Sequence, residues 1–136
     1  MRVTLSRRGD YAVRAVFDIA SHHGTRRKAA AIASAMAIPR GYLSQILSDL
    51  VQAGILLAQA GPAGGYTLAV EPRTLTLRTV VEAIEGLMTL ETCVLRGGPC
   101  AWEDRCPIHD TWASAQQAFA AALEATTFAD LTSGAT

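Results

Sequence analysis

The chain has 136 residues, half of them hydrophobic, and a formal net charge of zero. This length suits one compact domain, or a small domain with a dimerisation extension. No apolar run approaches the roughly 18 residues of a membrane span, and the first residues lack the apolar segment of a signal peptide. We therefore expect a cytoplasmic protein with no membrane partner, in which thiols stay reduced.

The zero net charge conceals a division along the chain. Residues 1–78 hold ten of the twelve basic side chains and only four acidic ones, so this part carries +6 and the remainder carries −6. A basic N-terminal part suggests nucleic-acid binding. An uneven scatter of solvated charges is the plainer explanation, and charge alone does not choose between the two.

Three helices are predicted in the basic part. Apolar residues at helical spacing from Tyr11 to Ala20 predict the first, which ends before Gly24. A second is expected over residues 28–36 and a third over residues 39–53, after a turn at Ile38-Pro39. The third helix should bury four aliphatic side chains: Leu43, Ile46, Leu47 and Leu50. Two short helices joined by a tight turn predict a helix-turn-helix, whose second helix can enter a major groove.

Two short apolar runs follow, at residues 55–58 and 66–70, with a turn rich in glycine between them. This pattern predicts a β-hairpin. The expected fold class is therefore mainly α with a small β-hairpin wing, a winged helix-turn-helix. At the wing tip, Gln59, Gly61 and Gly64 can approach the DNA backbone or minor groove because little side-chain bulk stands in the way. The glycines could equally serve the turn alone.

The third helix is predicted to carry sequence readout. Gln45 has the amide geometry to read adenine, and Ser44 can serve a base or a phosphate. Lys28 and Arg40 are placed as phosphate anchors, which set affinity and register. Tyr42 lies on the same face. The alternative is an ordinary solvated face of an amphipathic helix.

The acidic part is predicted to contain two further helices. Thr76 is a candidate N-cap for the first, which closes at Gly86. Pro107 opens the second, a long helix with an apolar stripe at Ile108, Trp112, Ala115, Phe119 and Ala122. The stripe suits packing against another helix, within the chain or across a two-fold axis. A homodimer would match the symmetry of a palindromic operator in double-stranded DNA.

All three cysteines lie close to one histidine in the loop between these helices. Cys93, Cys100, Cys106 and His109 have the spacing C-x6-C-x5-C-x2-H. Soft ligands in such a cluster suit zinc, copper or an iron–sulfur centre. A structural zinc site is one alternative, although zinc sites more often show a C-x2-4-C knuckle. A small zinc enzyme with Glu103 as base is less favoured, because no acid–base pair accompanies it.

Several motifs together resemble the IscR/NsrR/CymR type of bacterial regulator, the Rrf2 family. They are residues 9–15 (GDYAVRA), the helix-turn-helix, the wing residues 61–66 (GPAGGY) and the triple-cysteine loop. The resemblance covers nearly the whole chain. It implies a dimeric transcription factor, not an enzyme, with no small-molecule substrate. Residues 1–75 would form the winged DNA-binding domain, and residues 76–136 the cluster loop and dimerisation helices.

The resemblance also implies a cofactor and its ligands. The three cysteines would hold a [2Fe–2S] or [4Fe–4S] cluster that tunes DNA binding, with zinc or a thiol switch as the alternative. His109 would complete the ligand set, or Asp10 donated by the partner subunit. Tyr42, Ser44 and Gln45 match the reading face. The implied protein is a repressor that responds to nitric oxide, redox state or iron–sulfur status.

Three positions depart from the family pattern. Ala60 stands where many relatives place an arginine that enters the minor groove. The first cysteine spacing is one residue longer than the commoner five. Ala37 replaces a frequent turn glycine.

Overall fold

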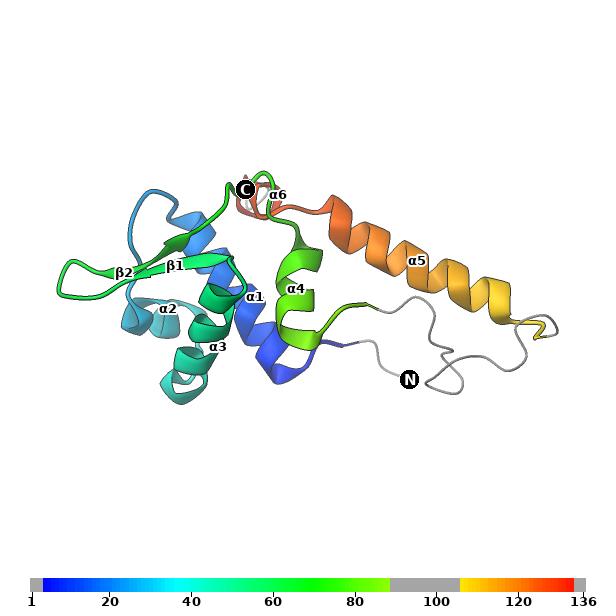
Figure 1. Ribbon diagram of the computed structural model, residues 1–136, viewed down its shortest axis with the longest axis horizontal. Helices are drawn as coiled ribbons and strands as arrows, with labels where there is room; N and C mark the ends of the chain where they lie inside the picture. The colour runs from blue at the N-terminus through cyan, green and yellow to red at the C-terminus, as the bar shows by residue number, and fades with distance from the viewer. Residues whose placement is uncertain (1–3, 89–105, 134–136) are drawn as a thin grey trace.

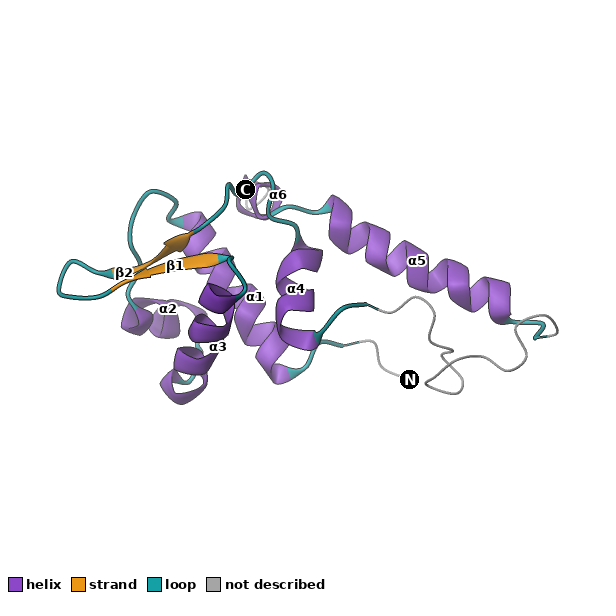
Figure 2. Ribbon diagram, viewed as in Figure 1, coloured by secondary structure: helices purple, strands orange, loops and turns teal. Residues whose placement is uncertain are grey.

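The computed structural model describes residues 4–88 and 106–133 (Figure 1). Six helices and one hairpin are found in these ranges, coloured by type in Figure 2. In chain order they are α1 (Arg7–Ser21), α2 (Ala29–Met36), α3 (Arg40–Gln52), β1 (Leu56–Gln59), β2 (Gly65–Leu68), α4 (Leu77–Glu85), α5 (His109–Ala125) and α6 (Phe128–Ser133). Among the described residues, no helix combines the length and apolarity required to cross a bilayer.

The winged helix-turn-helix predicted from the sequence is confirmed. Helices α1 to α4 lie where periodicity and turn residues placed them, and the two strands pair antiparallel as a hairpin. Thr76 caps α4 as expected, since its Oγ1 accepts a hydrogen bond from the Thr79 amide at 3.1 Å. Pro39 is the N-cap of α3, so the helix begins one residue later than predicted.

The turn between α2 and α3 is formed without glycine. Ala37 adopts the left-handed conformation, with φ at 55° and ψ at 48°. A side chain in this region costs roughly 1–2 kcal/mol, so Ala37 adopts a conformation that glycine would adopt without this cost. The turn directs Ile38 into the core, where the side chain is 4% exposed and its amide donates to the Ala33 carbonyl at 3.0 Å.

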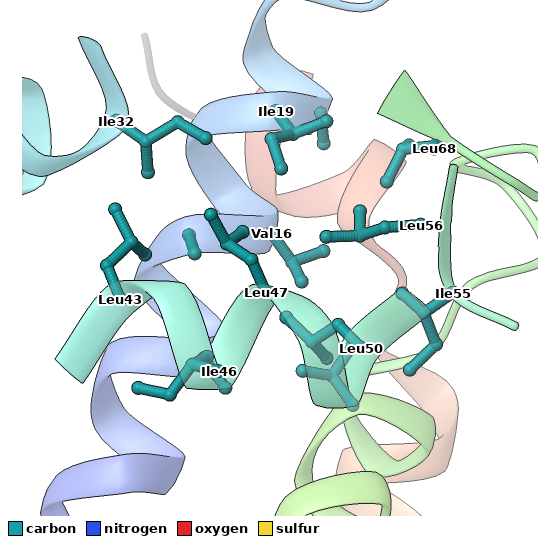
Figure 3. Close-up of a cluster of buried hydrophobic side chains, with 14 of the residues drawn as sticks. Val16, Ile19, Ile32, Leu43, Ile46, Leu47, Leu50, Ile55, Leu56 and Leu68 are labelled. Atoms are coloured by element: carbon teal, nitrogen blue, oxygen red, sulfur yellow. The ribbon is translucent and has the colours of Figure 1, made fainter. Parts of the chain in front are cut away.

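The core lies between α3, α1 and the hairpin (Figure 3). The buried face of α3 consists of the four aliphatic residues predicted from spacing, and it packs on Val16 and Ile19 of α1. Leu56 and Leu68, which are directly paired in the hairpin, close the core on the wing side. Burial of each such side chain contributes about 1.5–3 kcal/mol. These contacts fix how α3 and the wing are presented to solvent.

Helix α6 was not predicted, and it belongs to the same core. Phe128 at its start is fully buried and packs in the cluster that α1 and α3 supply. The Phe128 amide donates to the Leu75 carbonyl at 3.0 Å, and Thr127 forms an isolated antiparallel β-bridge with Thr76. Helix α6 therefore packs against α1, although the two helices lie far apart in the sequence.

Helix α5 extends away from this core, and Figure 1 shows it reaching far beyond α4. Of its seventeen residues, only Ala120 is buried. Two members of the predicted apolar stripe stay open to solvent, with Ile108 37% and Phe119 47% exposed, while Trp112 is half-buried. The described part of one chain thus leaves much of the stripe uncovered.

A buried ion pair joins α1 to the segment before α2. Arg27 donates from Nε and Nη2 to the two carboxylate oxygens of Asp18, at 2.9 and 3.0 Å. The Asp18 side chain is fully buried, and this hydrogen bonding raises the pKa of Arg27. The backbone of Arg27 also pairs with Tyr66 of β2 through two hydrogen bonds of 3.0 and 2.8 Å. One residue therefore holds α1, the helix-turn-helix and the wing together.

Replacement of Arg27 by alanine should strongly destabilise the fold. It would leave the Asp18 carboxylate buried without its partner, at a cost of roughly 3–5 kcal/mol. Arg26→Ala is the matched control, because Arg26 is exposed and, among the described residues, its side chain donates only to the Ala63 carbonyl. Its loss should cost about 1 kcal/mol or less. Urea denaturation measures both, and equal losses would contradict this role for the ion pair.

Candidate nucleic-acid interface and metal-binding loop

The polar face of α3 is open to solvent. Arg40, Ser44 and Gln45 are all exposed, and the Tyr42 side chain is 47% exposed. The aliphatic residues between them are buried, so the backbone of the helix is firmly seated while these side chains point away from the core. A rigid helix with exposed polar groups in its first two turns has the arrangement needed to reach base edges.

A chain of polar contacts ties this face to α1. The Gln45 amide donates from Nε2 to Asp49 Oδ1 at 3.0 Å, one turn further along α3. The other oxygen of Asp49 accepts from the guanidinium of Arg8, at the start of α1. The side chain of Asp49 is only 25% exposed.

Aromatic and charged groups continue the contact between the two helices. The rings of Tyr42 and Tyr11 lie 5.9 Å apart, and the Arg14 guanidinium lies 5.6 Å from the centre of the Tyr11 ring. Arg14 also binds both carboxylate oxygens of Asp10, at 3.0 and 2.8 Å, and donates to the Met36 carbonyl at 3.2 Å. Asp10, the alternative fourth ligand, is thus paired within its own chain.

Two basic side chains hold the wing. Lys28 Nζ donates to the Pro62 carbonyl at 2.6 Å, and Arg26 Nη1 donates to the Ala63 carbonyl at 3.2 Å. The wing tip and the segment before α2 together line an open groove of about 1010 Å³. Its polar lining includes His23, Thr25, Arg26, Lys28 and Gln59. Positive charge therefore lies beside the wing, where a phosphate backbone would be attracted.

The three predicted wing residues have different surroundings. Gln59 is the exposed last residue of β1 and is paired with Gly65. Gly61 has φ at +96° and open space around its Cα. At Gly64 a Cβ atom would lie 2.0 Å from the Gln59 carbonyl oxygen. Glycine at position 64 is thus required by the turn itself, whatever part it takes in binding.

Only part of the predicted metal loop falls within the described residues. Cys93, Cys100 and Glu103 lie outside them. Cys106 is half-buried just before α5, and His109 is the first residue of that helix. The His109 amide donates to the Cys106 carbonyl at 3.3 Å, so the two residues share one turn. Within residues 4–88 and 106–133, no three potential metal ligands gather at one place.

Sequence reasoning missed Asp49 and Arg8 as parts of the candidate interface. Asp49 lies four residues after Gln45, a spacing at which helical side chains interact, so this pair was open to prediction. Arg8 is 41 residues away from Asp49. No local pattern indicates such a contact.

The exposed α3 and the adjacent wing define a winged helix-turn-helix protein. Residues 5–134 match the family described as "Rrf2: Iron-dependent Transcriptional regulator". The chain belongs to this Rrf2 family.

Relatives and solved structures agree with this assignment. The chain is 33% identical over 109 residues to the HTH-type transcriptional regulator IscR of Vibrio vulnificus, covering 79% of this chain but only 64% of that protein. It is 30% identical over 128 residues to IscR of Yersinia enterocolitica, covering 93% of this chain and 77% of that protein. Among solved structures, CymR, the global cysteine regulator of B. subtilis, superposes with a TM-score of 0.84 at 26% identity over 99% of this chain and all of the other. IscR of T. potens superposes with a TM-score of 0.78 at 27% identity, over 98% of this chain and 89% of the other. These relatives are named as regulators and not as enzymes.

Substitution of Gly64 by alanine should distort the wing. The added methyl group would collide with backbone atoms of Gln59 and Ala60, and a misfit of this kind costs roughly 1–3 kcal/mol. Gly41→Ala is the control, because Gly41 lies in α3 with nothing within 4 Å of a Cβ. That change should be neutral or stabilise by up to about 1 kcal/mol. Thermal unfolding followed by circular dichroism compares them, and equal stability would show that the turn tolerates a side chain at position 64.

Proposed function

We propose that the chain is a cytoplasmic, homodimeric transcriptional repressor that binds a palindromic operator in double-stranded DNA. An iron–sulfur cluster, [2Fe–2S] or [4Fe–4S], controls this binding in response to nitric oxide, redox state or iron–sulfur status. Residues 1–75 form the DNA-binding part, and residues 76–136 supply the ligand loop and the dimer helix.

The observation that carries the proposal is the exposed polar face of α3 beside a wing that Arg26 and Lys28 contact. Gln45 and Ser44 read bases, Tyr42 contacts the backbone or a base, and Arg40 and Lys28 anchor phosphates. In Figure 1, α2, α3 and the hairpin occupy the half of the molecule away from α5. One half is thus available for DNA while the other is available for a partner subunit. The wing contributes Gln59, Gly61 and Gly64.

The uncovered face of α5 supports the homodimer. An apolar groove of about 610 Å³ runs between α1, α4 and α5, and its lining includes Leu5, Val13, Val81, Leu87 and Phe119. Leu87 is 81% exposed and Phe119 is 47% exposed. Apolar surface in a continuous patch of this kind favours burial against another protein surface. A second copy of α5 would provide it.

The chemistry of the ligand loop supports the cluster. Three thiolates and an imidazole suit iron–sulfur centres, and Cys106 and His109 already share one turn. When bound, the cluster would supply a tie that nitric oxide or oxidants can break. We propose His109 as the fourth ligand in preference to Asp10, because Asp10 is engaged by Arg14 in its own chain.

The first turn of α1 offers a route from the ligand loop to the reading helix. Its N-cap, Ser6, donates its amide to Glu85 at the end of α4, at 3.0 Å. Arg8, two residues later, binds Asp49 of α3. A loop that is tied or released after α4 would therefore shift α1 and α3 together. To move such an equilibrium from mostly bound to mostly free takes about 5 kcal/mol, which lies within the range of metal–ligand bonding.

Alanine at Cys93, Cys100 or Cys106 should abolish the visible chromophore of anaerobically purified protein and change its operator affinity. Each substitution removes a ligand that the cluster needs. Absorption spectra, iron and zinc analysis, and footprinting of holo and apo protein measure these effects. His109→Ala should weaken cluster retention more than Asp10→Ala.

Two results would contradict the proposal. Colourless protein that contains zinc and no iron would replace the cluster by a structural zinc site. Cysteine variants that bind DNA like the cluster-loaded parent would contradict sensing by the cluster. A thiol switch would then be the hypothesis to test.

Gln45→Ala should relax discrimination at one or two base pairs by roughly 1–3 kcal/mol, because it removes a bidentate contact to adenine. Affinity of the parent protein should fall steeply with salt through counterion release. Binding-site selection followed by fluorescence anisotropy on single-base variants tests both. Uniform weakening across all sequences would instead make Gln45 a phosphate or structural residue.

A further inference from the structure

We infer that Asp49 is a positioning residue for base reading: it holds the Gln45 amide in one orientation, and Arg8 of α1 in turn holds Asp49. This inference rests on the proposed reading role of Gln45. It adds two residues, neither of which needs to touch a base, to the determinants of specificity.

The three side chains form a continuous line across two helices. One carboxylate oxygen of Asp49 accepts from Gln45 Nε2 at 3.0 Å, and the other accepts from Arg8 Nη2. Each oxygen therefore has its own donor. The Asp49 side chain is three-quarters buried, whereas Gln45 is exposed. Asp49 is thus largely shielded from solvent, whereas the Gln45 amide that it holds is accessible.

The chemistry of the contact decides which way the amide faces. An ionised carboxylate can only accept hydrogen bonds, so the nitrogen of Gln45 must face Asp49 and the amide cannot reverse. One N–H is used by Asp49. The second N–H and Oε1 remain free, and together they match the N7 acceptor and N6 donor of adenine. Guanine presents two acceptors at these positions, so the fixed amide opposes it.

A simple surface pair is the competing explanation. Polar side chains four residues apart on a helix commonly interact, with little effect beyond a small gain in helix stability. Two features favour a positioning role for Asp49 over a simple surface pair. A negative charge on a helix that approaches phosphates is unfavourable, yet Asp49 is kept there with its charge balanced by Arg8. The partner comes from a different helix, so the contact fixes Asp49 relative to the core and not only along α3.

The test compares base preference in variants of the full-length protein. Randomised double-stranded DNA is selected with parent, Gln45→Ala, Asp49→Ala and Arg8→Gln, and the preferred bases are counted at each position. Asp49→Ala and Arg8→Gln should lower the adenine preference by roughly two- to tenfold, the effect of ordering one flexible side chain before binding. The loss should fall at the position that Gln45→Ala erases. Asp49→Ala should add nothing when Gln45 is already alanine.

Arg7→Gln is the matched control. Arg7 adjoins Arg8 in the first turn of α1, is exposed, and forms no side-chain hydrogen bond or ion pair within the described residues. Both arginine variants lose one positive charge, so both should change overall affinity and its salt dependence alike. Only Arg8→Gln should change base preference.

Asp49→Asn separates orientation from charge. Asparagine keeps an oxygen that can accept from Gln45, so it should lose less of the adenine preference than alanine. Equal losses in the two variants would assign the effect to charge and overturn the inference. An unchanged preference in Asp49→Ala, or a change spread evenly over all positions, would also overturn it. Circular dichroism checks that each variant is folded.

The experiment also distinguishes the two levels of failure. If Gln45→Ala erases no preference, the proposed reading role fails and the role of Asp49 fails with it. If Gln45→Ala erases an adenine preference that Asp49→Ala leaves intact, the reading role stands and only the positioning role is lost.

Discussion

The buried pair between Asp18 and Arg27 is the constraint on which the arrangement of this molecule depends. A fully buried carboxylate is tolerated only beside its partner, because an unpaired charge in the core is costly. Asp18 lies in α1, and Arg27 precedes α2 and pairs by its backbone with β2. Through these contacts of Arg27, the helix-turn-helix and the wing are both anchored to Asp18 of α1. The core therefore sets the position of the wing relative to the helix-turn-helix.

Helix α1 also connects the two halves that differ in charge. Its first turn contacts the end of α4 through Ser6 and α3 through Arg8. Its buried face carries α3 and also receives Phe128 of α6. One hydrogen bond and one ion pair therefore connect the end of α4 to α3 by way of α1.

Two exposed surfaces of the molecule differ in chemistry. Basic and amide groups lie on α3 and beside the wing, and the exposed Leu87 and Phe119 line the apolar groove between α1, α4 and α5. Phosphates attract the first kind of surface and water disfavours the second. In the proposed dimer, one of these surfaces would meet DNA and the other a second subunit.

The sequence by itself determined the elements whose signals are local. Apolar spacing placed α1 to α5, glycine placed the hairpin turn, and alternation on α3 placed Ser44 and Gln45 on the exposed face, because periodicity records which side is buried. Helix α6 has six residues, too few for a periodic signal. The contacts of Asp18 with Arg27 and of Arg8 with Asp49 span 9 and 41 residues. Charged residues at those separations look alike in sequence, and only the packing of the helices decides which of them meet.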